Sequence, residues 1–119
     1  MTKFEVPKEI LDKVLQTIEL AINTGKIRKG SNETTKSIER GEAKLVAIAG
    51  DVQPPEIVMH IPVLCDEKKI PYVYISSKEE LGRATGINVG TAAGCIVEAG
   101  EGKSNLEEII KKLEELRKV

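Results

Sequence analysis

The chain has 119 residues and a formal net charge of −1; 40% of its residues are hydrophobic and 31% are charged. This balance is typical of one globular domain with a real core, and it excludes a disordered chain. No apolar run approaches the roughly 20 residues of a membrane-spanning helix, and the first residues lack the apolar core of a signal peptide. We therefore expect an intracellular, cytoplasmic protein that does not enter a membrane.

The residue types that usually carry catalysis or bind metals are sparse. Cys65 and Cys95 stand alone, His60 is the one histidine, and no zinc-site spacing exists. A dinucleotide-binding glycine motif, a P-loop and a nucleophile elbow are also missing from the sequence. We expect no metal, no cofactor and no enzymatic activity, with both cysteines in the core and His60 on a helix surface or in the core.

The first strong pattern along the chain is amphipathic. Apolar residues recur at three- and four-residue spacing from Ile10 to Ile22, with polar residues between them. This spacing predicts a helix of about four to five turns, and Asn23-Thr24-Gly25 is expected to end it. A short basic strand, Lys26 to Lys29, follows and is expected to turn at Gly30.

The next helix is predicted to be unusually polar. Ser31 or Asn32 is expected to cap it, because their side-chain oxygens accept first-turn N–H groups. Gly41 is expected to end it by adopting a positive φ. Ile38 is its only large apolar residue, although a packed helix normally presents an apolar stripe to the core. Packing alone therefore does not explain this segment.

Positive charge is concentrated around the same helix. The segment from Lys26 to Lys44 has six basic and three acidic residues, whereas the rest of the chain has 12 basic and 16 acidic residues. This distribution indicates a local anion site rather than a basic coat, with an ordinary solvated helix as the plain alternative. Glu33 repels phosphate, so its presence there favours contact with a hydrogen-bond donor on a base.

Beyond Gly41, apolar runs alternate with helical patterns. Strands are expected at 44–49, 72–75 and 94–99, and Ser77 and Ser104 are expected to cap two later helices. This alternation predicts an α/β fold over residues 1–119 as a single domain, a three-layer α/β/α sandwich around a small mixed four-stranded sheet.

One of the later helices is expected to be distorted. Pro54 and Pro55 should start it, and Pro62 should break or kink it near His60, because proline lacks a backbone donor. Its inner face is predicted to consist of apolar residues: Ile57, Val58, Ile61, Leu64 and Cys65.

A family resemblance is carried by residues 29–36, which read Lys-Gly-Ser-Asn-Glu-Thr-Thr-Lys, and by Glu39-Arg40-Gly41. This stretch resembles the Gly-Ala-Asn-Glu-x-Thr-Lys signature of the ribosomal L-seven-Ae family of kink-turn RNA-binding proteins. The similarity continues through 43–52, 60–65, 70–72, 77–78 and 81–82, and archaeal members are the most similar. Ser31, Gly50 and Asn88 depart from the usual residues of that family.

The resemblance implies a non-catalytic protein that binds kink-turns and kink-loops. Asn32 and Glu33 would contact guanines of sheared G·A pairs, and Lys36 would reach a guanine edge or a phosphate. The strand before them would meet the RNA backbone, and the loop 87–89 would cover the extruded nucleotide near Asp51. The predicted RNA-binding residues are Lys26, Arg28, Lys29, Gly30, Asn32, Glu33, Lys36, Arg40, Asp51, Ile87, Asn88 and Val89.

The resemblance also implies partners. The RNAs would be ribosomal RNA, box C/D and H/ACA guide RNAs and ribonuclease P RNA, the last linking the protein to tRNA processing. The protein partners would be a Nop5-type scaffold and fibrillarin, or the pseudouridylation proteins. Two alternatives stay open: a paralogue limited to one ribosomal site, and a small α/β enzyme or nucleotide-binding module that uses Asp51 and the strand ends.

Overall fold

The sheet is mixed, as the alternation of elements predicts. The computed structural model describes residues 6–87 and 89–117, and within these the chain forms one four-stranded sheet. Its strands are β1 (Lys26–Lys29), β2 (Leu45–Ala49), β3 (Tyr72–Ile75) and β4 (Ala93–Glu98). The strand order is β1-β4-β2-β3. β4 runs antiparallel to both β1 and β2, whereas β2 and β3 are parallel.

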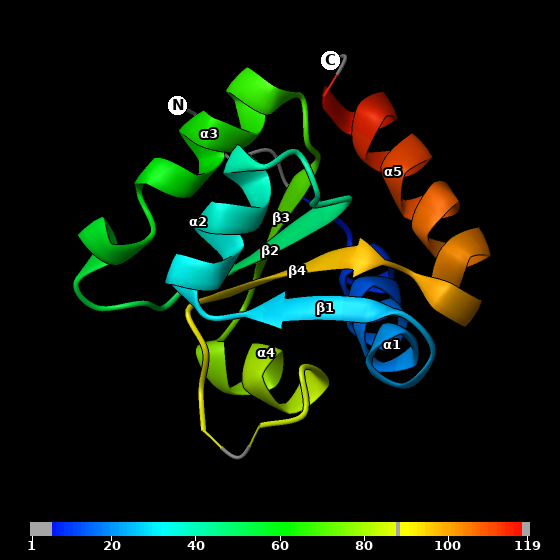
Figure 1. The fold of residues 1–119 in the computed structure, drawn as a ribbon, viewed down its shortest axis with the longest axis horizontal. Coiled ribbons are helices and arrows are strands. Elements are labelled where there is room, and N and C mark those ends of the chain that lie inside the picture. Colours follow the sequence, from blue (N-terminus) through cyan, green and yellow to red (C-terminus); the bar gives the residue numbers. More distant parts are fainter. Residues whose placement is uncertain (1–5, 88, 118–119) are drawn as a thin grey trace.

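Helices cover both faces of this sheet and confirm the three-layer sandwich (Figure 1). α2 lies in front of the sheet and packs against α3, while α1 lies behind it and contacts α4 and α5. In the described part of the chain the helices are α1 (Lys8–Thr24), α2 (Ser31–Glu39), α3 (His60–Lys68), α4 (Lys78–Ala84) and α5 (Lys103–Arg117), with 3₁₀ turns at Pro55–Ile57 and Gly100–Gly102.

The core lies between the layers. All five residues of β2 are buried, as expected of a central strand covered on both faces. α1 contributes Val14, Ile18 and Ala21 from its apolar stripe. Cys65 and Cys95 are buried, so both cysteines lie in the core as predicted.

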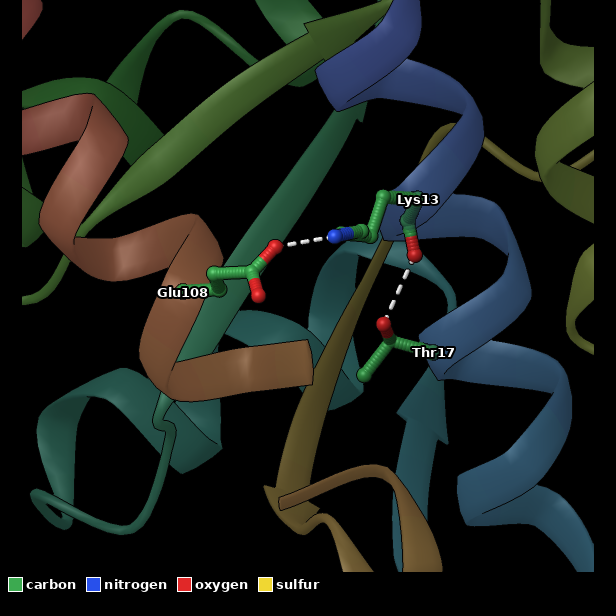
Figure 2. A network of polar contacts seen from close by, with 3 residues as sticks. All are labelled: Lys13, Thr17 and Glu108. Carbon is green, nitrogen blue, oxygen red and sulfur yellow. Dashed lines mark hydrogen bonds and ion pairs between the residues drawn. The ribbon is translucent and has the colours of Figure 1, made fainter. Parts of the chain in front are cut away.

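A polar contact joins the first and last helices (Figure 2). Lys13 of α1 donates to the carboxylate of Glu108 in α5, and the Thr17 hydroxyl donates to the Lys13 carbonyl at 2.7 Å. The hydrogen bond from Lys13 and its positive charge lower the pKa of Glu108. This link joins α5 to α1 on the exposed sides of the two helices.

The predicted cap of α2 is wrong, although its predicted end is confirmed. Gly30, not Ser31 or Asn32, occupies the N-cap position, with φ 95° and ψ 150°, and no side chain caps the helix. The chain turns at this residue because the Gly30 N–H is held by the Ala93 carbonyl at 2.8 Å. At the other end Gly41 has φ 72° and donates to the Ile38 carbonyl at 3.0 Å, and the Glu42 N–H donates to the Ser37 carbonyl at 2.9 Å, which together form a Schellman motif.

The predicted break near His60 is confirmed, although Pro62 itself lies inside the second helix, α3. The 3₁₀ turn Pro55–Ile57 is separate, and α3 begins at His60. Pro62 is then the third residue of α3, where a backbone N–H has no acceptor within the helix, so the proline is accommodated without a kink. Ile57 is 42% exposed instead of facing inward, whereas Ile61 is fully buried.

Of the two predicted serine caps, one is confirmed and one is wrong. The Ser77 hydroxyl accepts the Glu80 N–H at 3.2 Å at the start of α4, which confirms this cap. Ser104 is not a cap, because the 3₁₀ turn Gly100–Gly102 continues directly into α5 at Lys103.

Candidate nucleic-acid interface

All four strands bring loops to one end of the sheet. β1, β2 and β3 finish there, and β4 begins there because it is antiparallel to β1 and β2. Gly30, Asp51, Ser77 and the described residues of the loop 86–92 therefore meet at this end, which we call the site end. Most of the predicted RNA-binding residues belong to these connections or to the start of α2.

Backbone hydrogen bonds tie these connections together. The Ala93 carbonyl accepts the Gly30 N–H at 2.8 Å and the Thr91 hydroxyl at 3.2 Å. The Thr91 N–H in turn donates to the Lys78 carbonyl at 3.0 Å. The start of α2, the loop and the start of α4 thus form one continuous surface.

The outer face of α2 presents the predicted polar residues. Asn32, Glu33 and Lys36 are all exposed. The Lys36 ammonium lies 3.5 Å from a Glu33 carboxylate oxygen, and about half of each side chain remains exposed. Such an exposed pair contributes little to stability, so both groups are available to other partners.

The inner face of α2 is small and polar apart from Ile38. Thr34 and Ser37 are buried with Ile38, and α2 packs on β4 and β1. Ser37 lies beside Cys95, whose thiol has its pKa raised by burial, with a smaller lowering by the Ser37 hydroxyl. Short side chains therefore let α2 lie close to the sheet, which a search for large apolar residues in the sequence could not detect.

The basic residues of β1 do not form one cluster. Successive strand residues point to opposite faces, and Lys29 donates to the Thr85 carbonyl at the end of α4, at 3.0 Å. Arg28, the register partner of Cys95, is on the α2 side, where its charge lowers the pKa of that thiol. Lys26 lies at the opposite end of the strand, 4.0 Å from the Glu98 carboxylate.

Asp51 has a structural partner at the site end. Its carboxylate accepts the Lys78 N–H at 2.8 Å, so it fastens the residue after β2 to the first turn of α4. The structure therefore places Asp51 close to the loop, as predicted, but with its oxygen directed at the backbone. Arg40 is exposed at the C-terminal end of α2, far from Asn32 along the helix.

The loop 86–92 rests on α4. Val89 is 71% exposed and Ile87 is half-buried, while the predicted residue Asn88 lies outside the described residues. A Cβ atom at Gly82 would be 2.2 Å from the Val89 carbonyl oxygen. Gly82 therefore lets the loop approach α4 closely, a role that the sequence analysis did not predict. The signal in the sequence was a glycine inside a helical pattern, which often marks a close packing contact.

An apolar surface lies next to the polar one. Ile57, Met59 and Val63 are 42%, 63% and 57% exposed around the start of α3. Met59 and Val63 also line a groove of about 370 Å³ between α3 and the ends of β2 and β3. We call these three residues the apolar patch; exposed clusters of this kind typically mark protein interaction sites.

Two further properties of the described residues bear on the site. Within residues 6–87 and 89–117, no group of three His, Cys, Asp or Glu residues could hold a metal ion. In the same part of the chain no helix has the length and apolar content needed to cross a membrane.

Comparison with known proteins identifies the family of the chain and solved structures with a similar fold. The profile of the ribosomal protein L7Ae/L30e/S12e/Gadd45 family matches residues 12–107, a range that includes every predicted RNA-binding residue. Among solved structures, the chain is similar to the 15.5kD RNA binding protein of Giardia lamblia, with a TM-score of 0.87 and 37% sequence identity. The match covers 93% of this chain and 92% of the Giardia chain.

Proposed function

The chain belongs to the ribosomal protein L7Ae/L30e/S12e/Gadd45 family, and from this premise we propose that it is a non-catalytic RNA-binding protein that recognises kink-turns and kink-loops. The similarity to an RNA binding protein over nearly the whole chain supports this function. The observation that carries the proposal is the exposure of Asn32 and Glu33 in the first turn of α2, beside the loop 86–92.

The chemistry of α2 suits base edges. An Asn amide offers both a donor and an acceptor, and a carboxylate accepts from N–H groups, so Asn32 and Glu33 together can bind guanines of sheared G·A pairs. Lys36 releases Glu33 and turns to a guanine edge or a phosphate. Arg28, on the α2 side of β1, binds the backbone, which sets the register without reading sequence.

The remaining site residues divide into contacts and supports. Val89 is exposed on the loop, and its apolar side chain covers the extruded nucleotide. Lys29 and Asp51 hold the two ends of α4 through the Thr85 carbonyl and the Lys78 N–H. They act on RNA by keeping the loop in place, because α4 is the platform on which the loop rests.

The natural RNAs follow from the family resemblance. They are ribosomal RNA, box C/D and H/ACA guide RNAs and ribonuclease P RNA in an archaeal cytoplasm, where the protein nucleates assembly of the ribosome and of guide ribonucleoproteins. The apolar patch supports a protein partner such as a Nop5-type scaffold, which recruits fibrillarin. Because α3 packs against α2, a protein on this patch would lie beside the bound RNA.

The test is a binding comparison with the full chain. One RNA contains a kink-turn; its control is a duplex of equal length in which Watson–Crick pairs replace the sheared G·A pairs and the bulge is removed. We expect saturable, much tighter binding to the kink-turn at one salt concentration, and no binding of ATP or S-adenosylmethionine. Equal affinity for both RNAs would exclude kink-turn recognition, and sequencing of RNAs that co-purify with the protein would identify its natural targets.

A further inference from the structure

A hydrogen bond links the RNA-binding helix to the helix beside it. Nε2 of His60, the first residue of α3, lies 2.8 Å from the hydroxyl oxygen of Thr35 in α2. The same hydroxyl lies 2.7 Å from the carbonyl oxygen of Ser31, the first residue of α2. These two contacts form a chain that runs from α3 into the first turn of α2.

The direction of this chain follows from its hydrogens. A threonine hydroxyl has one proton to donate, and a carbonyl oxygen can only accept, so Thr35 donates to Ser31. In the hydrogen bond between His60 and Thr35 the imidazole must then be the donor and the hydroxyl oxygen the acceptor, which requires a proton on Nε2. His60 is exposed, and this contact gives its Nε2–H a defined acceptor.

The first turn of α2 is otherwise held by backbone hydrogen bonds and by the buried Thr34. Its N-cap is Gly30, and no side chain caps the helix. Asn32 and Glu33 lie in this turn, between the two residues that the chain joins, Ser31 and Thr35. A turn with a glycine cap and two exposed polar side chains has freedom to fray, and the contact from α3 reduces it.

We propose that His60 is a positioning residue for RNA binding: through Nε2–H···Oγ1 of Thr35 and Oγ1–H···O=C of Ser31, it holds the turn that carries Asn32 and Glu33 in the geometry that the RNA requires. His60 itself does not contact the RNA. The inference rests on the proposed function, and it adds a residue of α3 to the set that determines affinity.

The experiment measures kink-turn and duplex binding for variants that separate donor geometry from packing. His60→Ala and Thr35→Val each remove the bond and should weaken kink-turn binding about threefold to tenfold, the effect of one neutral hydrogen bond. Their combination should cost no more than either alone, because both break the same chain. Glu67→Ala, at an exposed position of α3, is the control and should bind like the wild type.

Conservative variants give the sharper readout. The amide nitrogen of glutamine can occupy the place of Nε2, so His60→Gln should restore binding to within about twofold of the wild type. Asparagine is too short to reach Thr35, so His60→Asn should remain as weak as His60→Ala. A long-range ¹⁵N–¹H spectrum of the wild type should show His60 protonated at Nε2.

Each result decides the proposal. Wild-type affinity in Thr35→Val, equal affinities of the Gln and Asn variants, or a His60 protonated only at Nδ1 would overturn it. The spectrum and Thr35→Val decide it even if His60→Ala fails to fold. A wild type that does not prefer the kink-turn over the duplex would instead overturn the proposed function, so the two failures are distinguishable.

Discussion

α2 and α3 are neighbouring helices of equal length with opposite surfaces. Each has nine residues, and neither has a side-chain cap at its start. α2 exposes Asn32, Glu33 and Lys36, whereas the start of α3 exposes Met59 and Val63. Both bury an isoleucine completely, Ile38 and Ile61, so their roles in the core are alike. Their outer faces differ in a way that fits the proposed partners: a polar face suits base edges, and an apolar face suits a protein.

The starts of the two helices differ as well. The N-cap residue of α2, Gly30, has φ 95° and ψ 150°, a region that essentially only glycine occupies. The N-cap residue of α3, Met59, has φ −62° and ψ −28°, which any residue adopts. Backbone geometry thus restricts the N-cap position of α2 to glycine, whereas the N-cap position of α3 accepts other residues.

The largest expected effect concerns the polar face. Glu33→Gln keeps the size of the side chain but removes the charged acceptor. If Glu33 accepts from guanine N–H groups, kink-turn binding should weaken by about 1–3 kcal/mol, with duplex binding unchanged. Calorimetry or gel shifts at one salt concentration measure both. Equal or tighter kink-turn binding would mean that Glu33 only repels phosphate, and the base contact would be wrong.

The contrast between the two helix starts predicts different tolerance to substitution. Gly30→Ala should lower the free energy of unfolding by about 1–3 kcal/mol, because alanine is strained at this φ and ψ. No atom lies within 4 Å of a Cβ at Gly30, so the loss would come from backbone strain and not from a clash. Met59→Ala is the matched control and should change stability little. Urea unfolding of both variants tests this pair.

The apolar patch is expected to affect protein partners alone. Met59→Ser combined with Val63→Ser removes apolar area that a docked partner would bury, and should weaken scaffold recruitment by about 1–2 kcal/mol. Binding of the kink-turn by the isolated protein should be unchanged, because neither residue belongs to α2 or the loop. Native gels of the RNA complex with and without a Nop5-type scaffold measure the two steps. Loss of RNA binding in this variant would remove the distinction between the two faces.

The basic strand before α2 provides a test of how far the proposed RNA surface extends. Arg28→Ala should reduce the slope of log affinity against log salt by about 1, as expected for one lost phosphate contact. Lys26 lies at the other end of β1 beside Glu98, so Lys26→Ala should change this slope less. Equal reductions in both variants would show that the RNA extends along the whole strand.

The smallest effect is expected where neither face is involved. Glu108 has a lowered pKa because of Lys13, so its pairing stabilises the folded protein above the ordinary carboxyl pKa of 4.5 and is lost as the pH falls through the lowered folded-state value. Glu108→Gln should therefore lower the melting temperature slightly at neutral pH and make no difference in strong acid. The kink-turn affinity of Glu108→Gln should equal that of the wild type, because Glu108 belongs to neither α2 nor the loop 86–92.

Much of the site was predictable because it is local in the sequence. Asn32, Glu33 and Lys36 occupy one short helix whose polarity is visible in the residues themselves, and the structure places them on one exposed face. The different surroundings of Arg28 and Lys26 were not predictable, because they depend on strand register. Arg28 lies opposite Cys95, and Lys26 lies opposite Glu98. Neither partner is near in sequence.

The amino-acid sequence by itself determined the alternation of helices and strands, the glycine that ends α2 and the exposed polar residues of its outer face, since each depends on spacing or on one residue type. Tertiary structure decided the rest. Gly30 became the N-cap because the Ala93 carbonyl holds its N–H, and α3 began at His60, where the imidazole meets Thr35. These contacts join residues that are 63 and 25 positions apart, and local propensity carries no information on partners at such distances.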